Sequence, residues 1–405
     1  MLYVVHYGEI ALKGGNRGLF ERALARNLLK AVRPLGPARV TRLPGRLLVW
    51  SEGEDGKVRE ALAKVFGVEY FAPAVPVKPP SYEGMRDALL GLARALGEPP
   101  GGSFKIEVKR AHKGFPLTSP ELASRLGQDL RQATGWRVSL KEPGRTFHVE
   151  VLSDLCLLYG ERIRGPGGLP AGVSGRVLLL LSGGIDSPVA GWLLMKRGCQ
   201  LGFLHLYAYG SAEEALSGKV GRILLRLSEY GAEGKVFLAP YHRYQLASLR
   251  ASEGLELVLF KRFMLKLGAE LARRYGYEAL ATGDGLAQVA SQTLQNLAAQ
   301  SYLLPLPVLR PLLTYDKKEI VALARQIGTY ELSLQPYKDC CSLIARHPET
   351  RARAERLLKE EEKIGLDAIV AETLAELAVY ELSCAALRPA KAQDKALEAR
   401  AARIA

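Results

Sequence analysis

A continuous apolar strand that runs directly into a glycine turn and a helix constrains this chain more than any other segment. Residues 177–182 are apolar up to a closing serine and predict a strand buried on both faces, and residues 187–197 predict the helix. Between them stand Gly183 and Gly184, which let the backbone approach a bound anion closely. The unpaired N–H groups at a helix N-terminus also favour negative charge. The pattern therefore predicts a phosphate site.

An aspartate inside this turn adds a requirement. The turn reads Ser182-Gly183-Gly184-Ile185-Asp186-Ser187-Pro188, and the carboxylate of Asp186 would repel a phosphate group. A Mg²⁺ ion that bridges carboxylate and phosphate oxygens would remove that repulsion. The simpler alternative is that Asp186 only caps the helix. The sequence contains no G-x-x-x-x-G-K-[ST] motif, which excludes the common P-loop.

Strand and helix patterns alternate from residue 176 onward. After the first strand and helix, a strand is expected at 201–207, and further strand–helix units at 213–239, 253–282 and 314–328. Continuous apolar strands that alternate with helices predict an α/β fold with a doubly wound parallel sheet. We therefore expect this domain over residues 174–387 and a terminal tail over 388–405.

Two small α+β units are expected to precede this domain, over residues 1–75 and 76–165. A Pro-rich stretch at 73–80 separates them, and a Gly- and Pro-rich linker follows at 164–172. Apolar spacing predicts helices at 19–33, 56–66, 82–96 and 119–133, and strands at 39–50, 69–77, 103–109, 136–141 and 146–153. Ser119 is the expected N-cap of the last helix.

The net charge of +14 is unevenly spread along the chain. Residues 1–173 hold 26 Lys and Arg against 17 Asp and Glu, whereas residues 174–405 hold 30 against 25. The basic first part suits a polyanion such as nucleic acid, and the alternative is a high isoelectric point without such a partner. We expect no membrane helix, signal peptide or disulfide scaffold, and hence a cytoplasmic protein.

The glycine turn resembles the PP-loop of ATP pyrophosphatases, which cleave ATP between its α and β phosphates. Other segments resemble the tRNA 4-thiouridine synthetase family, in the family's order. They are the opening His6–Arg17, the THUMP-domain signature Lys109–Ser119, a second ATP-site segment over 281–294, and Asp339-Cys340-Cys341-Ser342 at the place of the catalytic cysteine. The match runs to about residue 350 and implies a ferredoxin-like first unit and a THUMP domain as the second.

Two departures from the family accompany this resemblance. Asp284 stands where the family usually has a glutamate, a shortening that we expect to be tolerated. Many members also carry a C-terminal rhodanese domain that delivers sulfur, and we expect none in a chain of 405 residues.

The resemblance implies roles for individual residues. Asp186 would orient Mg²⁺ or the attack on the α-phosphate, and Lys317 is linked to adenylation. The implied ATP contacts are Leu180, Leu181, Ser182, Gly183, Gly184, Ser187, His205, Leu206, Lys261, Arg262, Gly283 and Gln292. Alternatives remain for three of them: a core histidine for His205, and a solvated helix face for Lys261 and Arg262.

Cys341 is the expected sulfur nucleophile. It belongs to an adjacent pair in a polar segment, where a thiolate can be reached. Cys156, Cys199 and Cys384 lie in apolar runs and are expected to be small buried side chains. Because no C-x-x-C pair occurs, we expect no zinc or iron–sulfur site.

The candidate RNA contacts form two sets. The first set combines phosphate-binding charge with an aromatic ring and consists of Lys109, Arg110, Lys113 and Phe115. The second set is another basic patch and consists of Lys13, Asn16 and Arg17. For any single residue the alternative is an ordinary solvated surface.

Together these expectations describe an ATP-dependent tRNA sulfurtransferase. ATP would adenylate O4 of the uridine at position 8, and a persulfide on Cys341 would replace AMP with sulfur to give 4-thiouridine. A cysteine desulfurase or another persulfide donor would charge Cys341. A role in thiamine thiazole synthesis and a homodimer are also considered. Two alternatives stay open: a PP-loop ligase that passes the adenylate to an amine, and a non-enzymatic RNA-binding protein.

Overall fold

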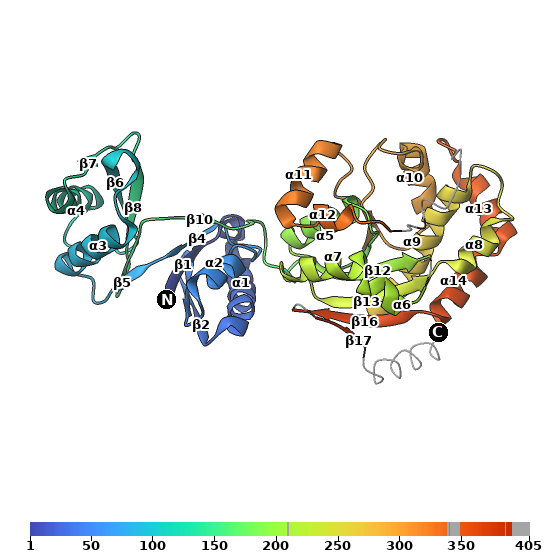
Figure 1. Ribbon diagram of the computed structural model, residues 1–405, viewed down its shortest axis with the longest axis horizontal. Helices are drawn as coiled ribbons and strands as arrows, with labels where there is room; N and C mark the ends of the chain where they lie inside the picture. The colour runs from blue at the N-terminus through green and yellow to red at the C-terminus, as the bar shows by residue number, and fades with distance from the viewer. Residues whose placement is uncertain (209, 338–339, 341–348, 385, 391–405) are drawn as a thin grey trace. The chain divides into compact units, whose positions relative to one another are not determined.

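The computed structural model describes residues 1–208, 210–337, 340, 349–384 and 386–390, and the chain divides into two compact units, Met1–Gly168 and Leu169–Ala405 (Figure 1). Each unit has its own hydrophobic core, and unit 1 contains two sheets. Across the described residues, no helix is both long and apolar enough to span a membrane.

The first sheet of unit 1 is antiparallel and has the order β10-β4-β1-β3-β2. Its strands are β1 (Leu2–His6), β2 (Ala38–Leu43), β3 (Arg46–Ser51), β4 (Tyr70–Pro73) and β10 (Ile163–Arg164). Helices α1 (Arg17–Val32) and α2 (Asp55–Leu62) pack their apolar faces into its core. The strand β10 joins this sheet although its sequence position was expected to belong to the second unit.

The second sheet of unit 1 has the order β5-β9-β8-β6-β7. Its strands are β5 (Val75–Val77), β6 (Ser103–Arg110), β7 (Arg137–Val138), β8 (Arg145–Val151) and β9 (Cys156–Tyr159), with helices α3 (Tyr82–Leu96) and α4 (Ser119–Thr134). The N-cap of α4 is Thr118, so the prediction of Ser119 was wrong by one residue. Thr118 has extended backbone and forms a reciprocal capping box with Glu121.

A buried glutamate connects the two sheets of unit 1. Glu150 on β8 forms an ion pair with Arg46 on β3, and its Oε1 lies 3.0 Å from Nε2 of His6 on β1. The hydroxyl of Tyr159 on β9 donates to the same carboxylate at 2.9 Å. Burial alone would raise the pKa of Glu150, but these partners outweigh it and lower the pKa to about 2.

Unit 2 is built on a seven-stranded sheet with the order β15-β14-β11-β12-β13-β16-β17. Its strands are β11 (Arg176–Leu180), β12 (Gln200–Tyr207), β13 (Gly234–Pro240), β14 (Ala279–Ala281), β15 (Val308–Leu309), β16 (Ala378–Ser383) and β17 (Ala386–Pro389). The first five strands in this order are parallel. Beyond this predicted parallel part, β16 and β17 extend the sheet as an antiparallel ribbon.

Helices cover both faces of this sheet (Figure 1). They are α5 (Asp186–Lys196), α6 (Ala212–Ser217), α7 (Lys219–Ser228), α8 (His242–Ser248), α9 (Glu256–Tyr275), α10 (Leu294–Ser301), α11 (Lys317–Ile327), α12 (Tyr330–Ser333), α13 (Ala354–Ile364) and α14 (Leu366–Ala375). Leu178 and Leu180 pack with α9 in one core, whereas Leu179 lies against Gly191 of α5. The continuous apolar run in β11 is thus explained by burial on both faces, which confirms the predicted fold class.

We predict that Glu150→Gln destabilises unit 1 by about 3–5 kcal/mol, because it leaves Arg46 and His6 buried without their anion. Hydrogen exchange of β8 amides in the full chain measures this free energy. The ordinary pKa of 4.5 lies above the folded value of about 2. Ionised Glu150 therefore stabilises the fold above pH 4.5, and this contribution is lost as the pH falls from there toward 2.

Glu161→Gln is the matched control in the same unit. Its side chain is 35% exposed and pairs with Arg59, so we expect a loss below about 1 kcal/mol. The stabilising role of the buried carboxylate would be contradicted if both variants lost the same free energy of unfolding. It would also be contradicted if the free-energy difference between wild type and Glu150→Gln stayed unchanged down to pH 3.

Candidate active site

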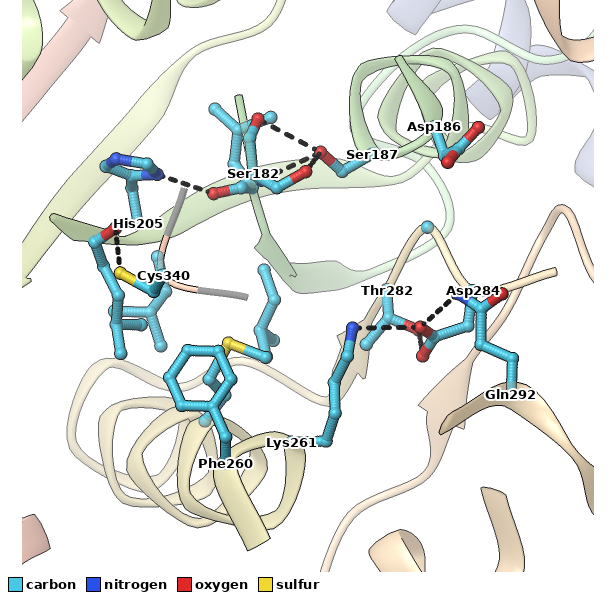
Figure 2. Close-up of a pocket in the computed structure, with 16 residues that line it drawn as sticks. Ser182, Asp186, Ser187, His205, Phe260, Lys261, Thr282, Asp284, Gln292 and Cys340 are labelled. Atoms are coloured by element: carbon cyan, nitrogen blue, oxygen red, sulfur yellow. Dashed lines mark hydrogen bonds and ion pairs between the residues drawn. The ribbon is translucent and has the colours of Figure 1, made fainter. Parts of the chain in front are cut away.

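The turn between β11 and α5 is closed by its own two serines. The Ser182 N–H donates to Oγ of Ser187 at 2.9 Å, and the two hydroxyl oxygens lie 3.0 Å apart (Figure 2). The N–H of Gly184 donates to Oγ of Ser182 at 3.2 Å. These hydroxyls, expected to face an anion, thus also fix the shape of the turn. Asp186 follows as the first residue of α5.

A second turn, which contains Gly283, lies in close backbone contact with the β11–α5 turn. Gly283 follows β14, and a Cβ atom added to it would lie 2.6 Å from the backbone N of Ser187 and 2.9 Å from the carbonyl carbon of Asp186. Only a residue without a side chain fits this approach without displacing the N-terminus of α5. The ends of β11 and β14 therefore meet at the carboxyl edge of the sheet, where open α/β folds bind ligands.

Asp284, the next residue, collects the polar side chains around this turn. Its Oδ1 accepts from Nζ of Lys261 at 3.2 Å and from Nε2 of Gln292 at 3.1 Å, and its Oδ2 accepts from the Thr282 hydroxyl at 2.7 Å (Figure 2). Burial acts to raise the pKa of Asp284, but the Lys261 ammonium and these hydrogen bonds hold it below its ordinary value. Asp284 is therefore a buried, ionised carboxylate that binds three side chains around this turn.

The two turns and α9 line a cavity of about 120 Å³ at the carboxyl edge of the sheet. Ten predicted residues line it: Leu180, Leu181, Ser182, Asp186, Ser187, His205, Leu206, Lys261, Gly283 and Gln292. Six lining residues were not among the predicted contacts: Leu204, Phe260, Met264, Thr282, Asp284 and Cys340. The apolar spacing of Phe260 and Met264 on either side of Lys261 was the available signal for two of them.

His205 and Cys340 form the inner end of this cavity. His205 is buried, with Nδ1 2.8 Å from the carbonyl oxygen of Leu181 and Nε2 2.6 Å from the hydroxyl of Tyr337. Cys340 was expected in an accessible polar loop, but its side chain is only 2% exposed. Its thiol donates to the carbonyl oxygen of Leu206 at 3.5 Å. Cys341 lies outside the described residues.

The remaining cysteines separate into two classes. Cys156 and Cys199 are buried as expected, whereas Cys384 is exposed, so its prediction as a buried side chain was wrong. Burial raises the pKa of the Cys156 thiol to about 11.

Two predicted basic residues have contrasting positions. Lys317, the first residue of α11, places its Nζ 2.6 Å from Oδ1 of Asp186 although its side chain is half exposed. Arg262 points away from the cavity, because it forms a buried ion pair with Glu361 and donates to the carbonyl oxygen of Gln300 at 3.1 Å. The structure therefore does not bring Arg262 to this cavity, and the ion pair connects α9 to α13.

In unit 1, the predicted RNA contacts of the second sheet lie at the end of β6 and in the loop after it. Lys109 and Lys113 are exposed, and Phe115 packs partly into the second core. Arg110 donates to the carbonyl oxygen of Phe115 at 2.9 Å and also to that of Leu117. The guanidinium therefore shapes the loop that carries the other residues.

The predicted patch near the N-terminus is also partly structural. Arg17 donates to the hydroxyl of Tyr7 and lies 3.0 Å from the carboxylate of Glu21. Lys13 lies 3.5 Å from the carboxylate of Glu9. Asn16 precedes α1 without capping it through its side chain.

The cavity combines the β11–α5 glycine turn, the ammonium group of Lys261 and an apolar wall that includes Phe260, and Lys317 pairs with the lining residue Asp186. It suits a ligand with a phosphate chain and a flat ring. Within the described ranges, no three His, Cys, Asp or Glu side chains are grouped for a metal. A Mg²⁺ ion would fit only with Asp186 and oxygen atoms of the ligand as its donors, a donor set that this ion commonly accepts.

Comparisons with known proteins match almost the whole chain. The ThiI ferredoxin-like domain matches residues 2–72, the THUMP domain residues 81–161, and the family "Thiamine biosynthesis protein (ThiI)" residues 172–366. A probable tRNA sulfurtransferase from Moorella thermoacetica is 39% identical over 93% of this chain and 96% of its own length. One from Thermus thermophilus is 42% identical over 93% and 92%. A solved 4-thiouridine synthetase, in complex with RNA and ATP, shares 33% identity and a TM-score of 0.85, covering 94% of this chain and 99% of that one.

We predict that Gly283→Ala destabilises unit 2 by about 1–3 kcal/mol, because the new methyl group overlaps the backbone of Ser187. Urea unfolding, with hydrogen exchange of α5 amides as the local readout, measures the loss. Gly184→Ala is the control, since its added Cβ would meet Oγ of Ser182 at an ordinary 3.4 Å. Equal losses in both variants would show that the close approach at Gly283 is not what requires a glycine.

Proposed function

Because this chain belongs to the ThiI family of tRNA sulfurtransferases, we propose that it catalyses ATP-dependent transfer of sulfur to a uridine of tRNA. The observation that carries the proposal is the cavity at the ends of β11, β12 and β14, where an anion-binding turn and a buried cysteine face the same space. A phosphate-activating reaction and a thiol reaction need these two features together. The target that we propose is uridine 8, which would become 4-thiouridine.

The first step is adenylation of the uracil. O4 attacks the α-phosphorus of ATP, pyrophosphate leaves, and N3 of the base loses its proton. The N–H groups of the β11–α5 turn would bind phosphate oxygens, and Lys317 would neutralise charge that develops on them. A Mg²⁺ ion held by Asp186 and the phosphates would further stabilise the departing pyrophosphate. The carbonyl oxygen O4, a poor leaving group, thereby becomes part of AMP, a good one.

The second step is sulfur transfer. We propose that Cys341 carries a persulfide supplied by a cysteine desulfurase or another persulfide donor. The terminal sulfur attacks C4, the C4–O4 bond breaks, and AMP leaves with the oxygen. One thiol of an external dithiol reductant then attacks Sγ of Cys341, which releases the sulfur on C4 as 4-thiouridine and leaves a mixed disulfide on Cys341. The second thiol of the reductant displaces Cys341 from this disulfide, so the reductant is oxidised and the Cys341 thiol is restored.

The tRNA is bound, in this proposal, mainly by the basic residues of unit 1. Lys109, near the end of β6, and Lys113, in the loop after it, are exposed, so phosphate oxygens can reach them. Arg110 and Phe115 support the shape of this loop, because Arg110 binds its carbonyl oxygens. We also place the enzyme in the cytoplasm with its tRNA; a homodimer and a thiamine-related role stay predictions.

The decisive experiment incubates the enzyme with tRNA, ATP, Mg²⁺ and a persulfide donor. It measures released pyrophosphate directly and 4-thiouridine by mass analysis of the tRNA nucleosides.

We predict that Lys317→Met lowers both products about 10²- to 10³-fold, because one stabilising charge is lost from the adenylation transition state. Cys341→Ser should abolish 4-thiouridine and leave pyrophosphate release intact, because adenylation needs no thiol.

Lys318→Met is the matched control, since Lys318 is the next residue and is exposed. It should leave both products near the wild-type level. Normal 4-thiouridine formation by Cys341→Ser would instead favour free sulfide acting on the adenylate. An absence of pyrophosphate release by the wild type with tRNA and ATP would favour a binding protein.

We predict that replacing both Lys109 and Lys113 with Gln weakens tRNA binding and reduces the slope of log K against log salt by about 1–2, because each lost phosphate contact releases about one counterion fewer. Filter binding at several salt concentrations measures this slope. The control replaces Lys57 and Lys64 with Gln, which changes the charge equally but removes lysines already paired with Glu54 and Glu60. Equal slopes for the two double variants would contradict the assigned RNA surface.

A further inference from the structure

Lys219 is a buried cation that the proposed chemistry does not use. It is the first residue of α7, and its side chain is 8% exposed. Its Nζ donates to the carbonyl oxygens of Ser333 at 3.1 Å and Gln335 at 2.9 Å. A helix N-terminus disfavours a cation, and burial of an ammonium group is costly unless it is compensated. The carbonyl oxygens at and after the end of α12 provide that compensation.

Tyr337 makes a second attachment of the same segment. Its hydroxyl lies 2.6 Å from Nε2 of His205, whose Nδ1 lies 2.8 Å from the carbonyl oxygen of Leu181. A carbonyl oxygen can only accept, so Nδ1 carries the proton and Nε2 accepts from the Tyr337 hydroxyl. The orientation of His205 in the cavity wall is thereby fixed from both sides.

Cys340 makes a third attachment, through the hydrogen bond from its thiol to the carbonyl oxygen of Leu206. The described residues 333–337 and Cys340, here called the cysteine segment, are therefore held at two places: by Lys219 at Ser333 and Gln335, and by the end of β12 at Cys340. Cys341 lies outside the described residues and is joined to Cys340 by one peptide bond.

The same two side chains also support the phosphate-binding turn. A Cβ atom added to Gly183 would lie 2.7 Å from Cε of Lys219 and 3.1 Å from Cδ1 of Tyr337. The end of the Lys219 side chain and the ring of Tyr337 thus pack against the turn, while the ammonium and hydroxyl groups form the hydrogen bonds described above. The ammonium also lies 5.4 Å from the centre of the Tyr337 ring, a cation–π distance.

We propose that Lys219 and Tyr337 are positioning residues that fix the cysteine segment beside the phosphate-binding turn, so that sulfur transfer depends on their polar atoms and adenylation does not. This inference rests on the proposed function, because it assigns the two residues to its second step. The physical reason is geometric: displacing a nucleophile by about 1 Å from its productive position costs on the order of 10²-fold in rate.

Two variants separate the polar atoms from the packing. Lys219→Met keeps a linear stem beside Gly183 and loses the ammonium, and Tyr337→Phe keeps the ring and loses only the hydroxyl. We expect each to release pyrophosphate within about 3-fold of the wild-type rate. Single-turnover formation of 4-thiouridine should fall at least about 10-fold, approaching the 10²-fold cost of a misplaced nucleophile. Tyr380→Phe is the control, because it removes a hydroxyl that binds Glu213 at 2.8 Å elsewhere in unit 2.

A third readout does not depend on activity. Iodoacetamide labelling of Cys340, followed by peptide mass analysis, reports how tightly the segment is held. Labelling should be faster in Lys219→Met and Tyr337→Phe than in the wild type and in Tyr380→Phe, because the thiol is buried only while the segment is fixed.

The outcomes distinguish this inference from the proposed function. Equal losses of pyrophosphate release and 4-thiouridine would place the effect at the nucleotide and overturn the positioning role. Wild-type sulfur transfer in Tyr337→Phe and Lys219→Met, with unchanged labelling, would overturn it as well. A wild-type enzyme without pyrophosphate release would defeat the proposed function, while the labelling would still report whether Lys219 and Tyr337 hold the segment.

Discussion

The site depends on a close approach between two stretches of backbone. The turn after β14 lies against the N-terminus of α5 because Gly283 brings no side chain between them. This contact aligns the ends of β11 and β14 and brings Asp284, the residue after Gly283, to the cavity that the β11–α5 turn also lines. From there the Asp284 carboxylate orients Lys261 and Gln292, which come from α9 and from the segment before α10. Four separate parts of the chain are thus arranged around one contact.

Where two basic residues are close in the sequence, one often stabilises the fold while the other is available at the candidate site. In α9, Lys261 lines the cavity, while Arg262, the next residue, forms a buried ion pair with Glu361 of α13. In unit 1, Arg110 shapes the loop on which Lys113 is exposed. Basic residues that are adjacent in the sequence therefore have different tasks, and a cluster of positive charge overstates the number of contacts available to a polyanion.

The sequence alone predicts the parts of this structure that depend on local signals. The β11–α5 turn is recognisable because the apolar run, both glycines and the helix start are contiguous. The shift of the α4 cap from Ser119 to Thr118 is a local ambiguity, since both residues cap well. The antiparallel β16–β17 ribbon and the pairing of β10 with β4 depend on distant partners, so neither has a local signal. Whether Lys261 or Arg262 faces the cavity depends on the packing of α9, and the burial of Cys340 depends on contacts with β12.

The edges of the seven-stranded sheet have a consequence for the association of separate copies of this chain. An open sheet edge can pair with another strand and start aggregation. At one edge, β15 has only two residues, and Pro307 and Pro311 flank it without N–H groups to donate. At the other edge, β17 ends at Pro389. Among the described residues, both edge strands are therefore short and bounded by proline, which limits edge-to-edge pairing and protects this mixed, strongly apolar sheet from growing by the addition of strands from other molecules.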